Sequence, residues 1–217
     1  MENTAQEGHM RKLTIVRHGK AAIKAEGQHE FGRDLTAEGV EQALALLGHP
    51  LLEGADGLAS SSALRAKRTV VLATDWAGTV FETIPELFPD PSEPGMGREL
   101  DALYRALGEV PVGDYLRAPG AAGVLMGYAE QGVVPIRQRI AEQGLKHLVV
   151  GCHGLFSNLL AFQLLKGPVG PYAGMLFDRH LGLCQGFHME LDDDLCATRI
   201  EFVAAITHDP HRYNSIP

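Results

Sequence analysis

Apolar runs of strand length alternate with amphipathic, helix-like segments along most of the chain. The strand-like runs cover residues 13–16, 57–60, 79–84 and 148–152. The helix-like segments cover residues 36–47, 63–76, 98–107, 115–131, 135–143 and 155–165. Strands that alternate with helices predict a parallel sheet whose faces are covered by helices. The expected fold class is therefore α/β, a three-layer α/β/α sandwich with a mostly parallel central sheet.

A pair of strand-like segments near the end of the chain departs from this alternation. Residues 181–191 and 196–204 are both typical of strands, and the acidic segment Asp192-Asp193-Asp194 joins them. A short polar turn between two strands favours an antiparallel hairpin. We therefore expect these two strands to form an antiparallel edge of the sheet.

The first helix-like segment carries its own start and stop signals. Thr36 is a predicted N-cap, because a threonine hydroxyl can accept a hydrogen bond from a free backbone N–H at the start of a helix. Val40, Leu44 and Leu47 recur at helical spacing and predict an apolar face. Gly48 follows and predicts the end of the helix.

Two long segments interrupt the alternation. Residues 21–33 form a polar, glycine-containing stretch, and residues 85–97 are rich in proline, which predicts neither a central strand nor a helix. Long loops in compact domains are often functional. We predict one domain over residues 10–217, with lid insertions at about 21–33 and 85–131. Residues 1–9 are expected to be a disordered or cloning-derived tail, and the polar segment from residue 207 to be peripheral.

Composition excludes several function classes. The 217 residues are 45% hydrophobic, which suffices for one sizeable core, and no apolar run reaches membrane-spanning length. A net charge of -8 argues against non-specific binding to nucleic acid or to an anionic membrane surface. Cys152, Cys184 and Cys196 are scattered and predict neither a disulfide framework nor a zinc site. Since the N-terminus lacks the apolar core of a secretory signal, we expect a reduced, cytoplasmic setting.

Two of the predicted parallel strands end in the same way. Arg17-His18-Gly19 follows the first strand, and Cys152-His153-Gly154 follows the fourth. Because parallel strands place their carboxyl ends at one edge of a sheet, His18 and His153 are expected to converge on one ligand. Arg65, in the first turn of the helix after the second strand, can reach the same edge. Two arginines, two histidines and nearby helix N-termini predict a phosphate pocket.

Four motifs, taken in this order, resemble one known family. They are the Arg-His-Gly strand end at 17–19, Asp-Leu-Thr-x-x-Gly-x-x-Gln-Ala at 34–43, Ser-Ser-x-Leu-Arg-Ala-x-x-Thr at 61–69 and His-Gly at 153–154. Over residues 13–165 the chain resembles the histidine phosphatase (phosphoglycerate mutase-like) superfamily, and its short Arg-His-Gly-Lys-Ala opening is most similar to the phosphohistidine phosphatase branch. This resemblance implies a phosphoglycerate mutase-like fold and a phosphatase.

The resemblance also implies roles for individual residues. His18 would be the nucleophile that forms a covalent phosphohistidine, which water then hydrolyses. Beside it, His153 would also take part in catalysis. The phosphoryl oxygens would be bound by Arg17, Arg65, His153 and Gly154. Because arginine stays charged at physiological pH, neither a metal nor a cofactor is expected.

The leaving group needs a proton donor, which in many members of the family is a glutamate just after the third strand. Glu86 is our first choice for this acid, with Glu82 and Asp90 as alternatives. The sequence here departs from the family pattern, since no Trp-Glu-Gly-like segment follows. A phosphohistidine substrate, which has a good leaving group, would depend less on a strong acid.

Other polar residues are assigned structural roles. Cys152 lies in an apolar strand and is expected to be a buried, unreactive thiol, whereas Lys20 either adds charge near the pocket or points into solvent. Surface or capping roles are expected for His29, His49, His147, His180, His188, His208 and His211.

The expected ligand is a phosphorylated small molecule or a phosphoprotein, with no nucleic acid and no membrane as a partner. Two alternatives to a phosphatase remain open. The first is phosphoryl transfer of the phosphoglycerate mutase type, which would retain the phosphoryl group and exclude water. The second is a non-catalytic, phosphate-dependent binding protein. The sequence specifies neither the physiological substrate nor the oligomeric state.

Overall fold

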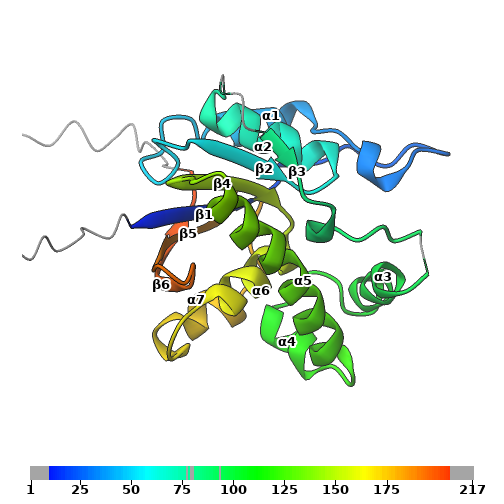
Figure 1. The fold of residues 1–217 in the computed structure, drawn as a ribbon. Helices are drawn as coiled ribbons and strands as arrows, with labels where there is room; N and C mark the ends of the chain where they lie inside the picture. Colours follow the sequence, from blue (N-terminus) through cyan, green and yellow to red (C-terminus); the bar gives the residue numbers. More distant parts are fainter. Residues whose placement is uncertain (1–9, 77, 79–80, 93, 206–217) are drawn as a thin grey trace, which may run out of the picture.

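A six-stranded mixed sheet forms the centre of the molecule (Figure 1). The computed structural model describes residues 10–76, 78, 81–92 and 94–205. In sheet order the strands are β3 (Phe81–Thr83), β2 (Gly57–Ser60), β4 (His147–Cys152), β1 (Arg11–Arg17), β5 (Gly186–Leu191) and β6 (Ala197–Val203). The first four in this order are parallel, whereas β5 and β6 are antiparallel. The predicted parallel sheet and its antiparallel edge hairpin are confirmed.

Helices cover both faces of this sheet. They are α1 (Ala37–Leu44), α2 (Leu64–Thr74), α3 (Met96–Leu107), α4 (Val112–Arg117), α5 (Ala121–Glu142), α6 (Gly154–Leu164), α7 (Ala173–Phe177) and the 3-10 helices η1 (Glu30–Gly32), η2 (Pro85–Leu87) and η3 (Gly170–Tyr172). Figure 1 shows α1 and α2 on one face and α5 and α6 on the other. Along β1, Ile15 packs into the core beside α5 and α6, whereas Val16 packs beneath α1 and α2. The predicted three-layer arrangement is confirmed.

Parts of the sequence predictions fall outside the described residues. These are positions 79 and 80 of the third strand, the tail of residues 1–9, and the segment from residue 207 with His208 and His211. Within the part of the chain that the structure describes, no helix combines the length and the apolar character needed to cross a membrane.

The start of α1 is as predicted, but its buried face is not. The Thr36 side chain caps the helix by accepting a hydrogen bond from the Gly39 N–H at 3.0 Å. Leu44 and Leu47, predicted to face inward, are 45% and 50% exposed, so that prediction is wrong. The buried positions of this segment are instead Gly39, Ala43 and Leu46.

The reason lies in a close approach between two backbones. A Cβ atom placed on Gly39 would lie 2.1 Å from the carbonyl oxygen of Lys20, and one placed on Gly19 would lie 2.6 Å from the carbonyl oxygen of Gly39. Only residues without a Cβ permit this approach. With Gly39 held against the chain that leaves β1, the positions four and seven residues later turn toward the sheet.

Gly39→Ala is expected to lower the free energy of unfolding by about 2 kcal/mol, because backbone atoms cannot yield to the added methyl group as a flexible side chain would. Glu41→Ala is the matched control, since Glu41 is exposed on the same helix. Urea denaturation of both variants measures the difference. A Gly39→Ala protein as stable as the control would contradict the close approach.

One helix forms where the sequence predicts two. α5 runs without interruption through Pro135, although proline removes a backbone hydrogen bond within a helix. Val133, Ile136 and Ile140 are buried on both sides of the proline. Packing of this face against the core offsets the local loss, so the helix continues.

The proline-rich segment 85–97 contains helical turns at both ends, although the sequence predicts no helix there. It begins with η2, where Pro85 takes the first helical position that proline tolerates well, and ends inside α3. Gly97 in α3 passes close to the loop, since a Cβ atom there would lie 2.2 Å from the carbonyl oxygen of Asp90. This contact folds the segment back toward the carboxyl edge of the sheet.

A buried polar cluster lies on the opposite side of the sheet from α5 and α6. The Thr14 hydroxyl lies 2.8 Å from both His147 Nε2 and His188 Nδ1, and donates to the Leu51 carbonyl oxygen at 2.9 Å. Surface or capping roles are therefore wrong for these two histidines, which are 3% and 5% exposed. His49 does cap a turn, because its Nδ1 accepts from the Leu51 N–H at 3.1 Å.

This cluster predicts acid-sensitive stability. Burial, followed by the charge of His188, lowers the pKa of His147 to about 4 from the usual 6.5. The unfolded chain therefore takes up this proton at a higher pH than the folded chain does. The contribution of neutral His147 to the free energy of unfolding is fully present above pH 6.5. It is lost as the pH drops toward 4, by up to about 3 kcal/mol.

His147→Gln removes this titration and is expected to flatten the loss of stability in acid. Urea denaturation at neutral pH and near pH 4 measures the change in unfolding free energy for both proteins. Equal acid losses in the variant and the native chain would show that His147 is not the titrating group.

Candidate active site

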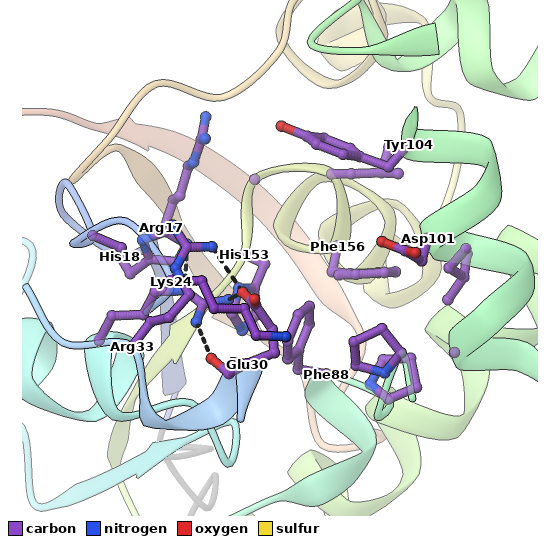
Figure 2. A pocket seen from close by; sticks show the side chains of 18 of the residues that line it. Arg17, His18, Lys24, Glu30, Arg33, Phe88, Asp101, Tyr104, His153 and Phe156 are labelled. Carbon is purple, nitrogen blue, oxygen red and sulfur yellow. Dashed lines mark hydrogen bonds and ion pairs between the residues drawn. The ribbon is translucent and has the colours of Figure 1, made fainter. Parts of the chain in front are cut away.

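A pocket of about 810 Å³ opens at the carboxyl edge of the parallel strands (Figure 2). Its wall includes Arg17 and His18 at the end of β1, Arg65 on α2, and His153 and Gly154 at the start of α6. The ring centroids of His18 and His153 lie 5.1 Å apart. The structure thus brings these predicted site residues together around one cavity.

His18 presents a defined nitrogen to this cavity. Its Nδ1 lies 2.7 Å from the Gly19 carbonyl oxygen, and because a carbonyl can only accept, Nδ1 carries the proton. The lone pair is therefore on Nε2, which accepts a hydrogen bond from Arg65 Nε at 3.2 Å. Burial, followed by the charge of Arg65, lowers the pKa of His18 to about 3. The imidazole is neutral at physiological pH, as a nucleophile must be.

His153 is held from two sides. Its Nε2 lies 2.9 Å from the Ser61 hydroxyl oxygen, and its ring stacks on Phe88 at a centroid distance of 4.0 Å. Burial, followed by the repulsion that a protonated His18 would exert, holds the pKa of His153 well below its usual value. The second histidine is thus also neutral, and its orientation is constrained by the loop that carries Phe88.

Arg65 is engaged through all three of its nitrogen atoms. Besides the contact of Nε with His18, Nη1 donates to the Glu30 carbonyl oxygen at 3.0 Å, and Nη2 pairs with the Glu30 carboxylate at 3.1 Å. Burial lowers the pKa of Arg65 to about 10, which leaves the guanidinium charged at neutral pH. The Glu30 carboxylate occupies an edge of Arg65 that a phosphoryl oxygen would also fit.

Arg17 is oriented by groups from distant parts of the chain. Its Nη1 donates to His180 Nδ1 at 3.0 Å and to the Leu181 carbonyl oxygen, and its Nη2 donates to the Glu109 carboxylate at 2.8 Å. The Nε atom of Arg17 is buried without a partner among the described residues. These contacts leave the Nε N–H and one N–H of Nη2 available for a bound anion.

Small residues hold these groups close together. The Gly19 N–H donates to the Thr69 hydroxyl at 3.0 Å, and that hydroxyl donates to the Arg65 carbonyl oxygen at 2.7 Å. A Cβ atom on Gly154 would lie 2.8 Å from His180 Cε1 and 3.2 Å from Arg17 Cδ. Glycine at position 154 therefore allows Arg17 to approach the N-terminus of α6.

The predicted general acid is not brought to this pocket. Glu86 is exposed in η2 and is not among the residues that line the cavity. Glu82, an alternative, pairs with Arg139 instead. Asp90 does line the pocket, but hydrogen bonds from Ser92 hold its pKa below the usual value, so it is a carboxylate at neutral pH.

Both segments predicted to be lid insertions contribute to the pocket wall. Lys24 and Arg33 come from residues 21–33, and Phe88 and Tyr104 come from residues 85–131. Figure 2 shows Lys24 and Arg33 gathered with His18 on one side of the pocket, and Phe88 and Tyr104 on the other. The cavity therefore combines a cationic end with an aromatic wall.

Sequence reasoning missed several residues of this pocket. His180, expected to be a surface or capping residue, lines it, as do Glu30 and Glu109. His29 lines it too, but its predicted capping role is confirmed, because its Nδ1 accepts a hydrogen bond from the Phe31 N–H at 3.2 Å at the start of η1. Only His180 had a usable signal. It precedes β5, and an antiparallel strand beside β1 must begin next to the carboxyl end of β1, where the site lies.

Two further sequence predictions concern Lys20 and the thiols. Lys20 lines the pocket and forms an ion pair with Glu38. Cys152 is buried, and burial raises the pKa of its thiol to about 12, which agrees with an unreactive side chain. Among the described residues, no group of three or more histidine, cysteine or acidic side chains is placed to hold a metal ion.

Similar solved structures share the fold. One is a mycobacterial glucosyl-3-phosphoglycerate phosphatase in complex with VO3, 20% identical, with a TM-score of 0.59 over 88% of this chain and 97% of that chain. A second is the alpha-ribazole phosphatase from Shigella flexneri, 20% identical, with a TM-score of 0.55 over 90% and 96%. A third, described as the phosphohistidine phosphatase SixA from Agrobacterium tumefaciens, is 16% identical, with a TM-score of 0.52 over 89% and 98%.

Sequence comparison extends this likeness beyond the fold. No curated protein matches the chain. The model of the histidine phosphatase superfamily (branch 1) matches residues 13–184, a range that contains all four motifs and the loop of His180. The chain therefore belongs to the histidine phosphatase superfamily.

Proposed function

We propose that this phosphatase hydrolyses a phosphomonoester or a phosphohistidine through a covalent intermediate on His18, without a metal ion. The observation that carries the proposal is the state of His18, which is neutral, with its Nε2 lone pair directed at Arg65 in the pocket. A neutral imidazole beside two guanidinium groups can attack a phosphorus atom that those groups have bound.

In the first step, the Nε2 lone pair of His18 would form a bond to phosphorus, and the bond from phosphorus to the leaving group would break. The leaving group departs with that electron pair. Arg17 and Arg65 would hold the phosphoryl oxygens and stabilise the charge that spreads over them in the transition state. For Arg65, this requires the Glu30 carboxylate to give up its place on Nη2.

In the second step, water would attack phosphorus, and the bond between phosphorus and Nε2 would break. The electron pair returns to Nε2, and inorganic phosphate leaves. The Nδ1 hydrogen bond to the Gly19 carbonyl oxygen keeps the same nitrogen in position for the next cycle. His153, fixed by Ser61 and Phe88, would contact the phosphoryl group from the other side.

The pocket favours substrates whose leaving group departs without a strong acid. Glu109, like Asp90, has a lowered pKa, here because it accepts a hydrogen bond from Arg17. Both are therefore carboxylates at neutral pH. A phosphohistidine or an activated ester meets this condition.

We also propose that residues 21–33 and 85–131 act as lids that admit the leaving group between Lys24 and the aromatic wall.

Phosphate release from p-nitrophenyl phosphate in the presence of EDTA tests this function, because its activated leaving group needs no acid. The proposal predicts turnover that EDTA does not reduce. Turnover that stops with EDTA and returns with a divalent cation would contradict metal independence. No phosphate release, together with interconversion of phosphoglycerate isomers, would identify a mutase instead.

A further inference from the structure

We propose that His180 is a positioning residue of this site, which orients Arg17 for the phosphoryl group by accepting a hydrogen bond from it. The inference rests on the proposed function and adds to it a residue from outside the four sequence motifs. His180 lies between α7 and β5, in the loop that passes the carboxyl end of β1.

The contact itself defines the state of the imidazole. Arg17 Nη1 can only donate, and it lies 3.0 Å from His180 Nδ1, so Nδ1 carries the lone pair and the proton is on Nε2. The same Nη1 donates to the Leu181 carbonyl oxygen. Both N–H groups of Nη1 are thus used by one loop. The Nε N–H and the Nη2 N–H that does not bind Glu109 remain to meet an anion.

The position of the ring makes this role specific to the pocket. His180 lines the cavity, and its Cε1 lies 2.8 Å from the place of a Cβ atom on Gly154. The imidazole therefore packs against the first residue of α6, next to His153. Its Nε2 is buried without a partner among the described residues. An unpaired buried N–H lowers the stability of the fold. The contacts of Nδ1 with Arg17 and of the ring with Gly154 give a reason why a histidine is nevertheless retained at this position.

Protonation of His180 would convert its acceptor into a donor facing Arg17. The charged groups around the ring are Arg17 from β1 and Glu109 from the segment after α3, and the Leu181 carbonyl oxygen lies beside them. Burial and Arg17 disfavour the imidazolium, whereas Glu109 favours it. Acid would therefore release one side of Arg17, and the KM for substrate would rise.

Two substitutions separate an acceptor from a simple space-filling side chain. Asparagine places its side-chain oxygen near the position of histidine Nδ1 and does not titrate, whereas leucine fills space without accepting. For each protein we would measure kcat and KM with p-nitrophenyl phosphate from neutral to acidic pH. Calorimetry would give the affinity for inorganic phosphate, a readout that does not require turnover.

His180→Leu is expected to weaken phosphate binding and raise KM about tenfold, with a smaller change in kcat. His180→Asn should stay within about threefold of the native protein and lose the rise of KM in acid. Unchanged phosphate affinity in His180→Leu would overturn the inference, and so would a His180→Asn protein as impaired as His180→Leu.

This design distinguishes the inference from the proposed function. A native chain that binds phosphate but does not hydrolyse the ester would refute the proposed function, and the loss of phosphate affinity in His180→Leu would still support the role of His180. A native chain that neither binds phosphate nor hydrolyses the ester would refute both.

Discussion

His18→Ala is expected to reduce phosphate release from p-nitrophenyl phosphate by about 10⁴-fold or more, because it removes the only atom assigned to attack phosphorus. The arginines that hold the phosphoryl oxygens remain in place. Affinity for inorganic phosphate, measured by calorimetry, is therefore expected to persist while turnover disappears. The separation of binding from turnover marks His18 as the nucleophile rather than a binding group.

A matched control comes from the strand that leads to the second histidine. Cys152→Ala removes the thiol next to His153, and the high pKa of this thiol predicts that turnover stays near the native value. A His18→Ala protein that keeps native turnover would show that another residue attacks phosphorus. Loss of turnover only in Cys152→Ala would assign that role to the thiol.

Arg65→Lys is expected to lower kcat by about 10²- to 10³-fold. Lysine retains the positive charge but loses the planar fork through which Arg65 contacts both His18 and the Glu30 position. The side chain of Arg65 is only 4% exposed, so water cannot replace the missing donors. Steady-state kinetics with p-nitrophenyl phosphate measures the loss.

Arg68→Lys is the control on the same helix. Arg68 lies one turn further along α2, is 42% exposed and pairs with Asp34 at the surface. Exposed ion pairs of this kind contribute little, so kcat is expected to stay within about twofold. Equal losses in the two variants would mean that Arg65 acts through the stability of α2 rather than through the phosphoryl group.

The sheet could be predicted from the sequence because its pattern is local. Residues 13–16 and 148–152 are largely apolar runs of strand length, and a His-Gly pair follows each of them, at 18–19 and at 153–154. The path of α5 through Pro135 and the buried face of α1 could not be predicted. They depend on packing partners far away in the sequence, such as the Lys20 carbonyl oxygen against Gly39.

The residues of the candidate site also fall into those that the sequence could predict and those that it could not. Arg17, His18 and His153 could be placed together because parallel strands share a carboxyl edge, and that edge follows from the fold class alone. Glu30 in η1 and Glu109 in the segment after α3 reach the arginines from stretches whose course no periodic pattern describes. The Glu86 assignment relied on a family position in a segment where this chain departs from the family, and the structure places that carboxyl outside the pocket.

The covalent intermediate is the central claim, and rapid quenching of the native enzyme with p-nitrophenyl phosphate tests it most directly. Samples quenched in alkali, which preserves a phosphorus–nitrogen bond, would be digested and analysed by mass spectrometry. The account predicts one phosphoryl group on the peptide that contains His18, formed with the first turnover and absent from His18→Ala. Turnover at the native rate with no phosphorylated His18 peptide at any time point would contradict it, since water would then attack the substrate directly.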